Sequence, residues 1–211
     1  MRRLGRALLR FFFRLLYHEC AWAYDPVAWV VSLGQWNAWV RTAMPHLRGE
    51  IVLEVAHGPG HLLGALKERG LSPVGLDLSP QMGRLARRRL RQRGLSVPLV
   101  RARAQALPFS DACFDSAVVT FPTEFILHPA TLRESWRVLR PRGRLVVVAW
   151  ARLSERDPLS RFLGWLYRVT GQGEPLPTGD EAVIVKAGFI PHTVWEPVGR
   201  SRVMTIVAIK R

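Results

Sequence analysis

The sequence predicts an α/β fold with a doubly wound, mostly parallel sheet that ends in an antiparallel hairpin. Apolar runs and amphipathic helical segments alternate from residue 49 to about residue 150, which is typical of parallel strands joined by helices. A strand, a glycine-rich turn and a helix follow one another at residues 51–69. Two runs of alternating apolar and polar residues close the chain and predict the hairpin at the edge of the sheet.

The first predicted unit has the properties of a nucleotide site. Ile51–Val55 is a short, β-branched apolar run that predicts a buried strand, and Gly58-Pro59-Gly60 predicts a turn directly after it. Leucines at helical spacing then predict a helix near 61–69. Such a unit offers free backbone N–H groups and a positive helix end to a ligand. Asp77 follows about 20 residues later, where a carboxylate can hold a ribose diol.

The remaining elements of the sheet follow in regular order. Ser79 and Pro80 have the residue types of a helix N-cap and first turn. Pro141-Arg142-Gly143 predicts the end of the last of these helices. We expect further strands near 73–77, 97–102, 114–121 and 143–150, and further helices near 80–93 and 129–139.

Residues 151–188 break this rhythm, and we interpret them as a helical insertion on the substrate side. They begin with an apolar, aromatic helix over Leu159–Val169 and continue through a glycine- and proline-rich loop over 171–179. A short helix near 180–187 precedes the hairpin strands Phe189–Pro197 and Arg202–Lys210. No repeat or interdomain linker is present, so residues 49–211 are expected to form one domain.

The first 48 residues are expected to form an amphipathic helix followed by an aromatic helical cap. Residues 2–17 place arginines on one helical face and leucines and phenylalanines on the other. Such a helix either lies in an anionic membrane interface or packs on its own domain. Tyr24-Asp25-Pro26 is expected to interrupt the helical chain. The three tryptophans within 27–44 indicate a lid over the main domain or a core helix pair.

Composition limits the partners of the chain. Its 211 residues include 31 Lys and Arg against 16 Asp and Glu, for a net charge of +15. This balance indicates an anionic partner or an arginine-biased composition with a solvated surface. Cys20 and Cys113 lack metal-ligand spacing, so no metal is expected and a reducing compartment fits. We expect a cytoplasmic protein, attached peripherally to the inner face of the membrane if residues 2–17 are interfacial.

Five motifs in order resemble those of the class I S-adenosylmethionine-dependent methyltransferases, and in particular the type 11 methyltransferase domain. The resemblance covers roughly residues 20–150 and implies a Rossmann-like fold and S-adenosylmethionine as the cofactor. Tyr24-Asp25 and the stretch 32–36 are similar to the entry segment of quinone-biosynthesis C-methyltransferases. The motifs lie at residues 54–60, 75–82, 104–109, 114–119 and 139–145.

The resemblance implies roles for the first two motifs. Gly58 and Gly60 would let the backbone approach the methionine moiety, and Glu54 would orient that loop or contact the ammonium group. Asp77 would accept hydrogen bonds from both ribose hydroxyls, while Leu78 and Met82 would contact the adenine.

Later motifs would complete the cofactor site. Ala104 and Gln105 would lie beside the adenine edge, Thr120 and Phe121 would face the reactive methyl, and Tyr24 would close over the cofactor. Ala56, His57 and Arg103 also fall at cofactor-binding positions but depart from the family pattern. Position 56 is usually glycine there, and alanine suits it only if φ is negative. Position 103 is commonly an aspartate, whereas arginine cannot accept a hydrogen bond.

Methyl transfer from a sulfonium depends mainly on in-line positioning, but a carbon or oxygen acceptor also needs a base. Glu124 and His128 are the candidate catalytic residues, with a surface or capping role as the alternative for His128. The expected reaction is methylation of a small-molecule or lipid-like acceptor.

Other functions are also open. A nicotinamide-dependent oxidoreductase is one, although Leu63 stands where its fingerprint requires glycine. A non-catalytic, membrane-associated relative is another. Nucleic acid is not expected as a partner, because the motifs of base methylation are absent after the fourth strand. The sequence does not indicate an oligomeric state.

Overall fold

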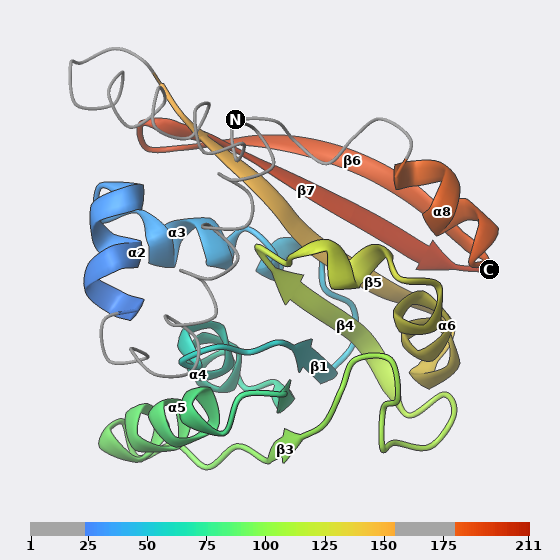
Figure 1. Ribbon diagram of the computed structural model, residues 1–211, viewed down its shortest axis with the longest axis horizontal. Coiled ribbons are helices and arrows are strands. Elements are labelled where there is room, and N and C mark those ends of the chain that lie inside the picture. The colour runs from blue at the N-terminus through green and yellow to red at the C-terminus, as the bar shows by residue number, and fades with distance from the viewer. Residues whose placement is uncertain (1–23, 155–179) are drawn as a thin grey trace, which may run out of the picture.

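The computed structural model describes residues 24–154 and 180–211, which form a seven-stranded sheet with helices on both faces (Figure 1). The strand order is β3-β2-β1-β4-β5-β7-β6. The first five strands in sequence pair in parallel, whereas β7 runs antiparallel to both β5 and β6. The predicted doubly wound sheet with an antiparallel C-terminal hairpin is therefore confirmed.

The elements agree closely with the sequence pattern. The strands are β1 (Ile51–Val55), β2 (Ser72–Asp77), β3 (Leu99–Arg101), β4 (Phe114–Thr120), β5 (Leu139–Leu153), β6 (Phe189–Val198) and β7 (Ser201–Lys210). The α-helices are α2 (Tyr24–Ser32), α3 (Trp36–Arg41), α4 (His61–Glu68), α5 (Pro80–Gln92), α6 (Pro129–Val138) and α8 (Asp180–Lys186). Two 3-10 helices are η2 (Met44–His46) and η3 (Glu124–Leu127).

Alternating side chains of the sheet supply two hydrophobic cores. Val52 and Val146 face one core with Trp39 of α3 and Leu62 of α4. The neighbouring residues Leu53 and Leu145 face the other core, which includes Leu132 of α6 and Ile184 of α8. Because successive residues of a strand point to opposite faces, each central strand joins the two cores.

Two local expectations need correction. Tyr24-Asp25-Pro26 is itself helical and forms the first turn of α2, where a proline needs no N–H partner, whereas its relation to the preceding residues lies outside the described part of the chain. The strand expected near 143–150 begins at Leu139, because the chain bulges between its pairings with Phe114 and Ser116. Gly143 is required in this bulge, since a Cβ there would lie 2.8 Å from the carbonyl oxygen of Arg140. The helices expected at 2–17 and 159–169 and the loop at 171–179 lie outside the described residues.

The aromatic segment predicted as a lid or core helix pair is the α2–α3 hairpin. The indole Nε1 of Trp39 donates to Ser201 Oγ at 2.8 Å, and Gln35 Oε1 accepts from the Arg200 N–H at 2.9 Å. These contacts fix α3 to the turn between β6 and β7. The hairpin bends at Leu33 and Gly34, both of which have positive φ.

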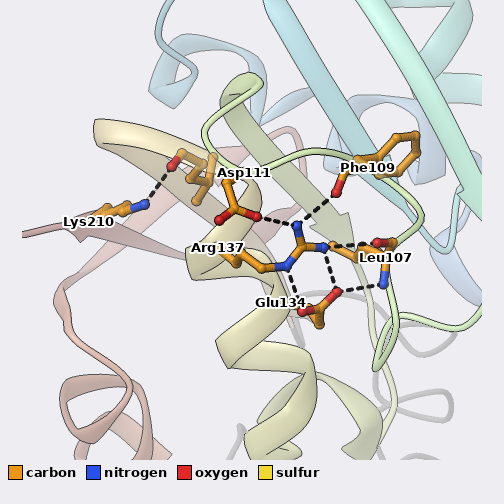
Figure 2. A network of polar contacts seen from close by, with 7 residues as sticks. Leu107, Phe109, Asp111, Glu134, Arg137 and Lys210 are labelled. Atoms are coloured by element: carbon orange, nitrogen blue, oxygen red, sulfur yellow. Dashed lines mark hydrogen bonds and ion pairs between the residues drawn. The ribbon is translucent and has the colours of Figure 1, made fainter.

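Arg137 of α6 fixes the segment that follows the third motif (Figure 2). Its guanidinium donates to the carbonyl oxygens of Leu107 and Phe109 and to the carboxylates of Asp111 and Glu134, all at 2.7–2.9 Å. Glu134 also accepts from the Leu107 N–H, and its hydrogen bond with Arg137 is the main cause that lowers its pKa. All five guanidinium protons are therefore used, which joins the motif at 104–109 to the helix before β5.

We expect Arg137→Ala to lower the free energy of unfolding by about 3 kcal/mol, because two carbonyls and two carboxylates lose charge-assisted partners. Urea denaturation measures the change. Arg133→Ala on the exposed face of the same helix is the control and should cost less than about 0.5 kcal/mol. Equal losses for the two variants would contradict this role of Arg137.

Candidate functional site

A cavity of about 280 Å³ opens at the carboxyl ends of β1, β2 and β4, beside the α2–α3 hairpin. Between β1 and β4 the strand order reverses, and such a switch point is where open α/β sheets bind ligands. The cavity is lined by Tyr24, Trp36, Val40, Glu54, Ala56, His57, Gly58, Pro59, His61, Leu62, Asp77, Leu78, Ser79, Thr120, Phe121, Pro122, Thr123 and Phe125.

The loop after β1 is built from left-handed backbone. Ala56, Gly58 and Gly60 have φ values of +56°, +53° and +81°. No atom lies within 4 Å of where a Cβ on Gly58 would sit, so the backbone there borders open space. Gly60 instead makes room for α5, because its Cβ would lie 2.9 Å from the Cβ of Ala86. The two glycines thus have different roles, one at the cavity and one in packing.

Asp77 holds this loop against the end of β2. One carboxylate oxygen accepts from the Gly58 N–H at 2.9 Å, and the other accepts from the Ser79 N–H at 2.8 Å. Each oxygen keeps a further lone pair for a ligand. Ser79 caps α5 by accepting from the Met82 N–H, as the sequence predicts. Asp77 is therefore fixed in orientation and still able to accept hydrogen bonds at the cavity.

Glu54 places a second carboxylate at the base of the cavity. Its residue is 1% exposed, and its Oε2 is buried without a hydrogen-bond partner. Burial and the nearby charge of Asp77 raise the pKa of Glu54 well above its ordinary value, against a smaller opposing effect of the Leu63 N–H. An unpartnered, buried acceptor is costly in a folded chain, and a cationic ligand group would supply the missing partner.

His57 fills the position after the left-handed alanine. Its ring is nearly buried, and Nδ1 lies 2.7 Å from the carbonyl oxygen of Gly58. Burial lowers the pKa of His57, although Asp77 opposes the shift. The ring fits because residue 75 in β2 is glycine. A larger residue there would place its Cβ only 2.9 Å from His57 Cδ2. The departure from the family pattern at 57 is thus accommodated by a neighbouring glycine.

Aromatic rings form the opposite wall of the cavity. Phe121 has a φ of +48° at the end of β4, and its N–H donates to the carbonyl oxygen of Val148 at 2.7 Å. This strained backbone places the Phe121 ring 4.7 Å from that of Trp36 at an interplanar angle of 34°. Tyr24 packs edge-on against Trp36 at 6.0 Å. The wall therefore presents flat apolar surfaces next to the glycine-containing loop after β1.

The structure brings together nine of the fourteen residues predicted to bind a cofactor: Tyr24, Glu54, Ala56, His57, Gly58, Asp77, Leu78, Thr120 and Phe121. The other five do not line the cavity. Met82 and Ala104 are buried, Gln105 is half-buried, Gly60 packs against α5, and Arg103 is exposed. The cofactor roles of all fourteen stay predictions.

Of the two predicted catalytic residues, only His128 has a described side chain, and it lies outside the cavity lining. The exposed His128 caps α6, with Nδ1 accepting from the Ala130 N–H at 3.2 Å. This contact is the capping role considered as the alternative for His128. Glu124 begins η3, and its side chain is outside the described residues.

Sequence reasoning did not select several residues that line the cavity. Trp36 and His61 carried a signal, because one lies in the aromatic hairpin and the other begins the helix after the glycine turn. Val40, Leu62 and Phe125 look like ordinary core residues in the sequence, and only the packing of the hairpin and η3 brings them to the cavity.

Comparison with known proteins identifies the family to which this chain belongs. A family model described as a methyltransferase domain matches residues 53–147. A demethylmenaquinone methyltransferase of Thermus thermophilus is 36% identical over 160 residues, which are 73% of this chain and 70% of that protein. The chain belongs to the class I S-adenosylmethionine-dependent methyltransferases. This membership gives no support to the oxidoreductase alternative.

Two further comparisons agree with this membership. A demethylmenaquinone methyltransferase of Deinococcus radiodurans is 34% identical over 188 residues, covering 85% of this chain and 76% of that protein. The solved structure of a geranyl diphosphate C-methyltransferase from Streptomyces coelicolor shares the fold. It has a TM-score of 0.62 and 15% identity, and the match covers 82% of this chain and 79% of that one.

The residues at the cavity fit S-adenosylmethionine, the cofactor of this family. Glu54 offers an unpartnered buried carboxylate oxygen for the ammonium group, and Asp77 offers free lone pairs for the ribose hydroxyls. Gly58 leaves the backbone open for close approach, and the half-exposed side chain of Leu78 offers apolar surface beside Asp77. Arg103 is exposed and does not obstruct the cavity.

Ala56→Gly should raise the free energy of unfolding by about 0.5–1 kcal/mol, since a left-handed conformation costs alanine more than glycine loses in chain entropy. Urea denaturation checks this, and Ala106→Gly is the control. Ala106 is an exposed loop alanine outside the positive-φ set, so its replacement should be neutral or destabilising. A loss of stability in Ala56→Gly would show that the alanine is not strained.

Glu54 should make stability depend on pH. Its pKa is raised in the folded chain, so folding favours the protonated form. Stability is full below the ordinary carboxyl value of 4.5 and falls as the pH rises toward the raised value. The free energy of unfolding of the wild type, relative to Glu54→Gln, should fall with a limiting slope of about 1.4 kcal/mol per pH unit. Parallel pH profiles for the two proteins would contradict this.

Proposed function

We propose that this methyltransferase transfers a methyl group to a lipid-like, quinone-type aromatic acceptor. The observation that carries the proposal is the composition of the cavity, with two carboxylates and an open glycine backbone at one side and a wall of aromatic rings at the other. The name of the Thermus relative supports a quinone acceptor.

The described residues divide the work of binding. Asp77 and Glu54 hold the hydroxyl and ammonium ends of the cofactor, which supplies a methyl on an already activated sulfonium. The Gly58 and Ser79 N–H groups fix the Asp77 side chain before binding, so the side chain loses little conformational freedom when the cofactor binds. Thr120 ends β4 at the cavity and Phe121 follows it, where an acceptor can reach the methyl group.

The aromatic wall favours a flat acceptor. Phe121 and Trp36 stack obliquely and offer ring faces at the cavity, which bind planar rings in offset or edge-on arrangements. Trp36 and Tyr24 belong to the hairpin, so the acceptor side is shaped by residues outside the sheet domain. A carbon acceptor also needs a proton acceptor, and Glu124 in the segment after β4 stays the prediction for that role.

We also propose a cytoplasmic protein whose residues 2–17 bind an anionic membrane surface, from which a lipid-like acceptor would be drawn. The net charge of +15 supports this proposal. Helix α5 adds support, because its exposed face carries arginines that pair with no carboxylate among the described residues: Arg84, Arg87, Arg88 and Arg91.

The test is methylation in vitro with a demethylated isoprenyl naphthoquinone that has been chemically reduced to its quinol, whose ring carbon is nucleophilic, in detergent micelles. We expect a product heavier by one methylene unit, detected by mass spectrometry. Asp77→Ala should abolish the product and weaken calorimetric binding of S-adenosylmethionine at least about a hundredfold, because two charge-assisted hydrogen bonds are lost. Asp111→Asn, an exposed carboxylate at 78% side-chain exposure, is the control. If the protein binds the cofactor but forms no product, the proposed quinone-type acceptor is contradicted and the cofactor assignment is not.

A further inference from the structure

Asp25, in the first turn of α2, makes three elements meet beside the cavity. Its Oδ1 lies 2.9 Å from His61 Nε2, at the start of α4. Its Oδ2 forms an ion pair with Arg89 of α5. The pKa of Asp25 is lowered, mainly by the hydrogen bond with His61, so the carboxylate is ionised at neutral pH.

Both partners of Asp25 contact or adjoin the loop after β1, residues 56–60, which is called the cofactor loop below. His61 lines the cavity itself. Arg89 also donates a hydrogen bond to the carbonyl oxygen of Pro59, which lines the cavity in the loop between the two glycines. Arg89 thus joins the carboxylate of the hairpin to the backbone of the loop. Tyr24, the neighbour of Asp25 in the chain, lines the cavity from the hairpin side.

The two helices of the hairpin are held in different ways: α3 is attached to the sheet, whereas α2 depends on contacts such as those of Asp25. Gln35 and Trp39 attach α3 to the turn before β7, 2.8–2.9 Å from their partners. Leu33 and Gly34, with positive φ, separate α3 from α2. Trp29 and Val30 of α2 are 65% and 53% exposed, so much of this helix faces outward rather than into the core. The start of α2 is therefore held beside the loop by the Asp25 contacts, together with the edge-on packing of Tyr24 against Trp36.

We propose that Asp25 is a positioning residue that locks α2 to the cofactor loop through His61 and Arg89. The lock holds Tyr24 at the cavity and fixes the Pro59 carbonyl and His61 in one arrangement. It rests on the placement of S-adenosylmethionine in this cavity. Because the lock orders the site before binding, its loss raises the cost of binding and opens a route for the cofactor to leave.

The chain offers a matched control in the ion pair between Glu68 of α4 and Arg93 after α5. Both carboxylates have 45% side-chain exposure, and both pair with an arginine at or directly after α5. Glu68 and Arg93 do not line the cavity. Glu68→Gln therefore removes a carboxylate–arginine ion pair of the same carboxylate exposure, between α4 and the end of α5, without touching the hairpin.

The experiment measures S-adenosylmethionine and S-adenosylhomocysteine binding to the full chain by calorimetry, and their dissociation by stopped flow. We expect Asp25→Ala and Arg89→Gln each to weaken binding about tenfold, mainly through faster dissociation. The double variant should be no weaker than Asp25→Ala, because both changes break one contact set. Asp25→Asn keeps the acceptor for His61 and should lie between Asp25→Ala and the wild type.

Turnover separates positioning from chemistry. The KM for the cofactor should rise about tenfold in Asp25→Ala, while kcat at saturation changes less than about twofold. Glu68→Gln should stay within about twofold of the wild type in all measurements. If Asp25→Ala does not fold, Arg89→Gln and Asp25→Asn carry the test.

Two results would overturn the proposal. Binding by the Asp25 and Arg89 variants within twofold of the wild type overturns the lock while leaving the cofactor assignment intact. Equal weakening by Glu68→Gln shows a general charge effect and also overturns it. Absence of cofactor binding by the wild type would instead overturn the cofactor assignment, and the lock with it.

Discussion

The hydrogen bond from the Gly58 N–H to Asp77 is the contact on which the site depends. It joins the end of β2 to the loop after β1, and so sets the distance between the Asp77 carboxylate and the open backbone at Gly58. The loop can reach Asp77 because Ala56, Gly58 and Gly60 turn it through left-handed conformations. Glu54 lies below this turn. The α2–α3 hairpin contacts the turn from the other side, through the interactions of Asp25 with His61 and Arg89. Strain in the loop is maintained by the sheet beneath it.

The site places two carboxylates in a strongly basic chain. Burial raises the pKa of Glu54, and the nearby charge of Asp77 adds to that effect. A cationic ligand relieves both costs, which gives a positively charged cofactor a favourable place inside a protein of net charge +15. The exposed arginines of α5 lie on the outer surface, where they can meet an anionic partner without entering the cavity.

The sheet could be predicted from the sequence because its signals are local. Short β-branched runs, the Ser79 cap and the glycine turn each specify their own element, and parallel order follows from alternation with helices. The β5 bulge was missed because it depends on the pairing with β4, which places Gly143 against the Arg140 carbonyl. The first turn of α2 was missed because proline ends one helix as readily as it begins another.

The candidate site was predictable where a motif carries the chemistry and unpredictable where packing does. Glu54, Gly58 and Asp77 line the cavity as expected, whereas Val40 and Phe125 reach it only through the tertiary arrangement of the hairpin and η3. Ala56 could be recognised as unusual, but its φ of +56° is a property of the folded loop. Arg103 was a concern at the adenine edge, and its exposure in the structure removes that concern.

The most direct test of the central claim is a crystal structure of the chain with S-adenosylhomocysteine. The account predicts the nucleoside in the cavity, with both ribose hydroxyls within hydrogen-bond distance of the Asp77 carboxylate and the amino group beside Glu54 Oε2. It also predicts the Asp25 contacts with His61 and Arg89 intact. A nucleoside bound elsewhere, or one in the cavity without contact to Asp77 or Glu54, would contradict the account.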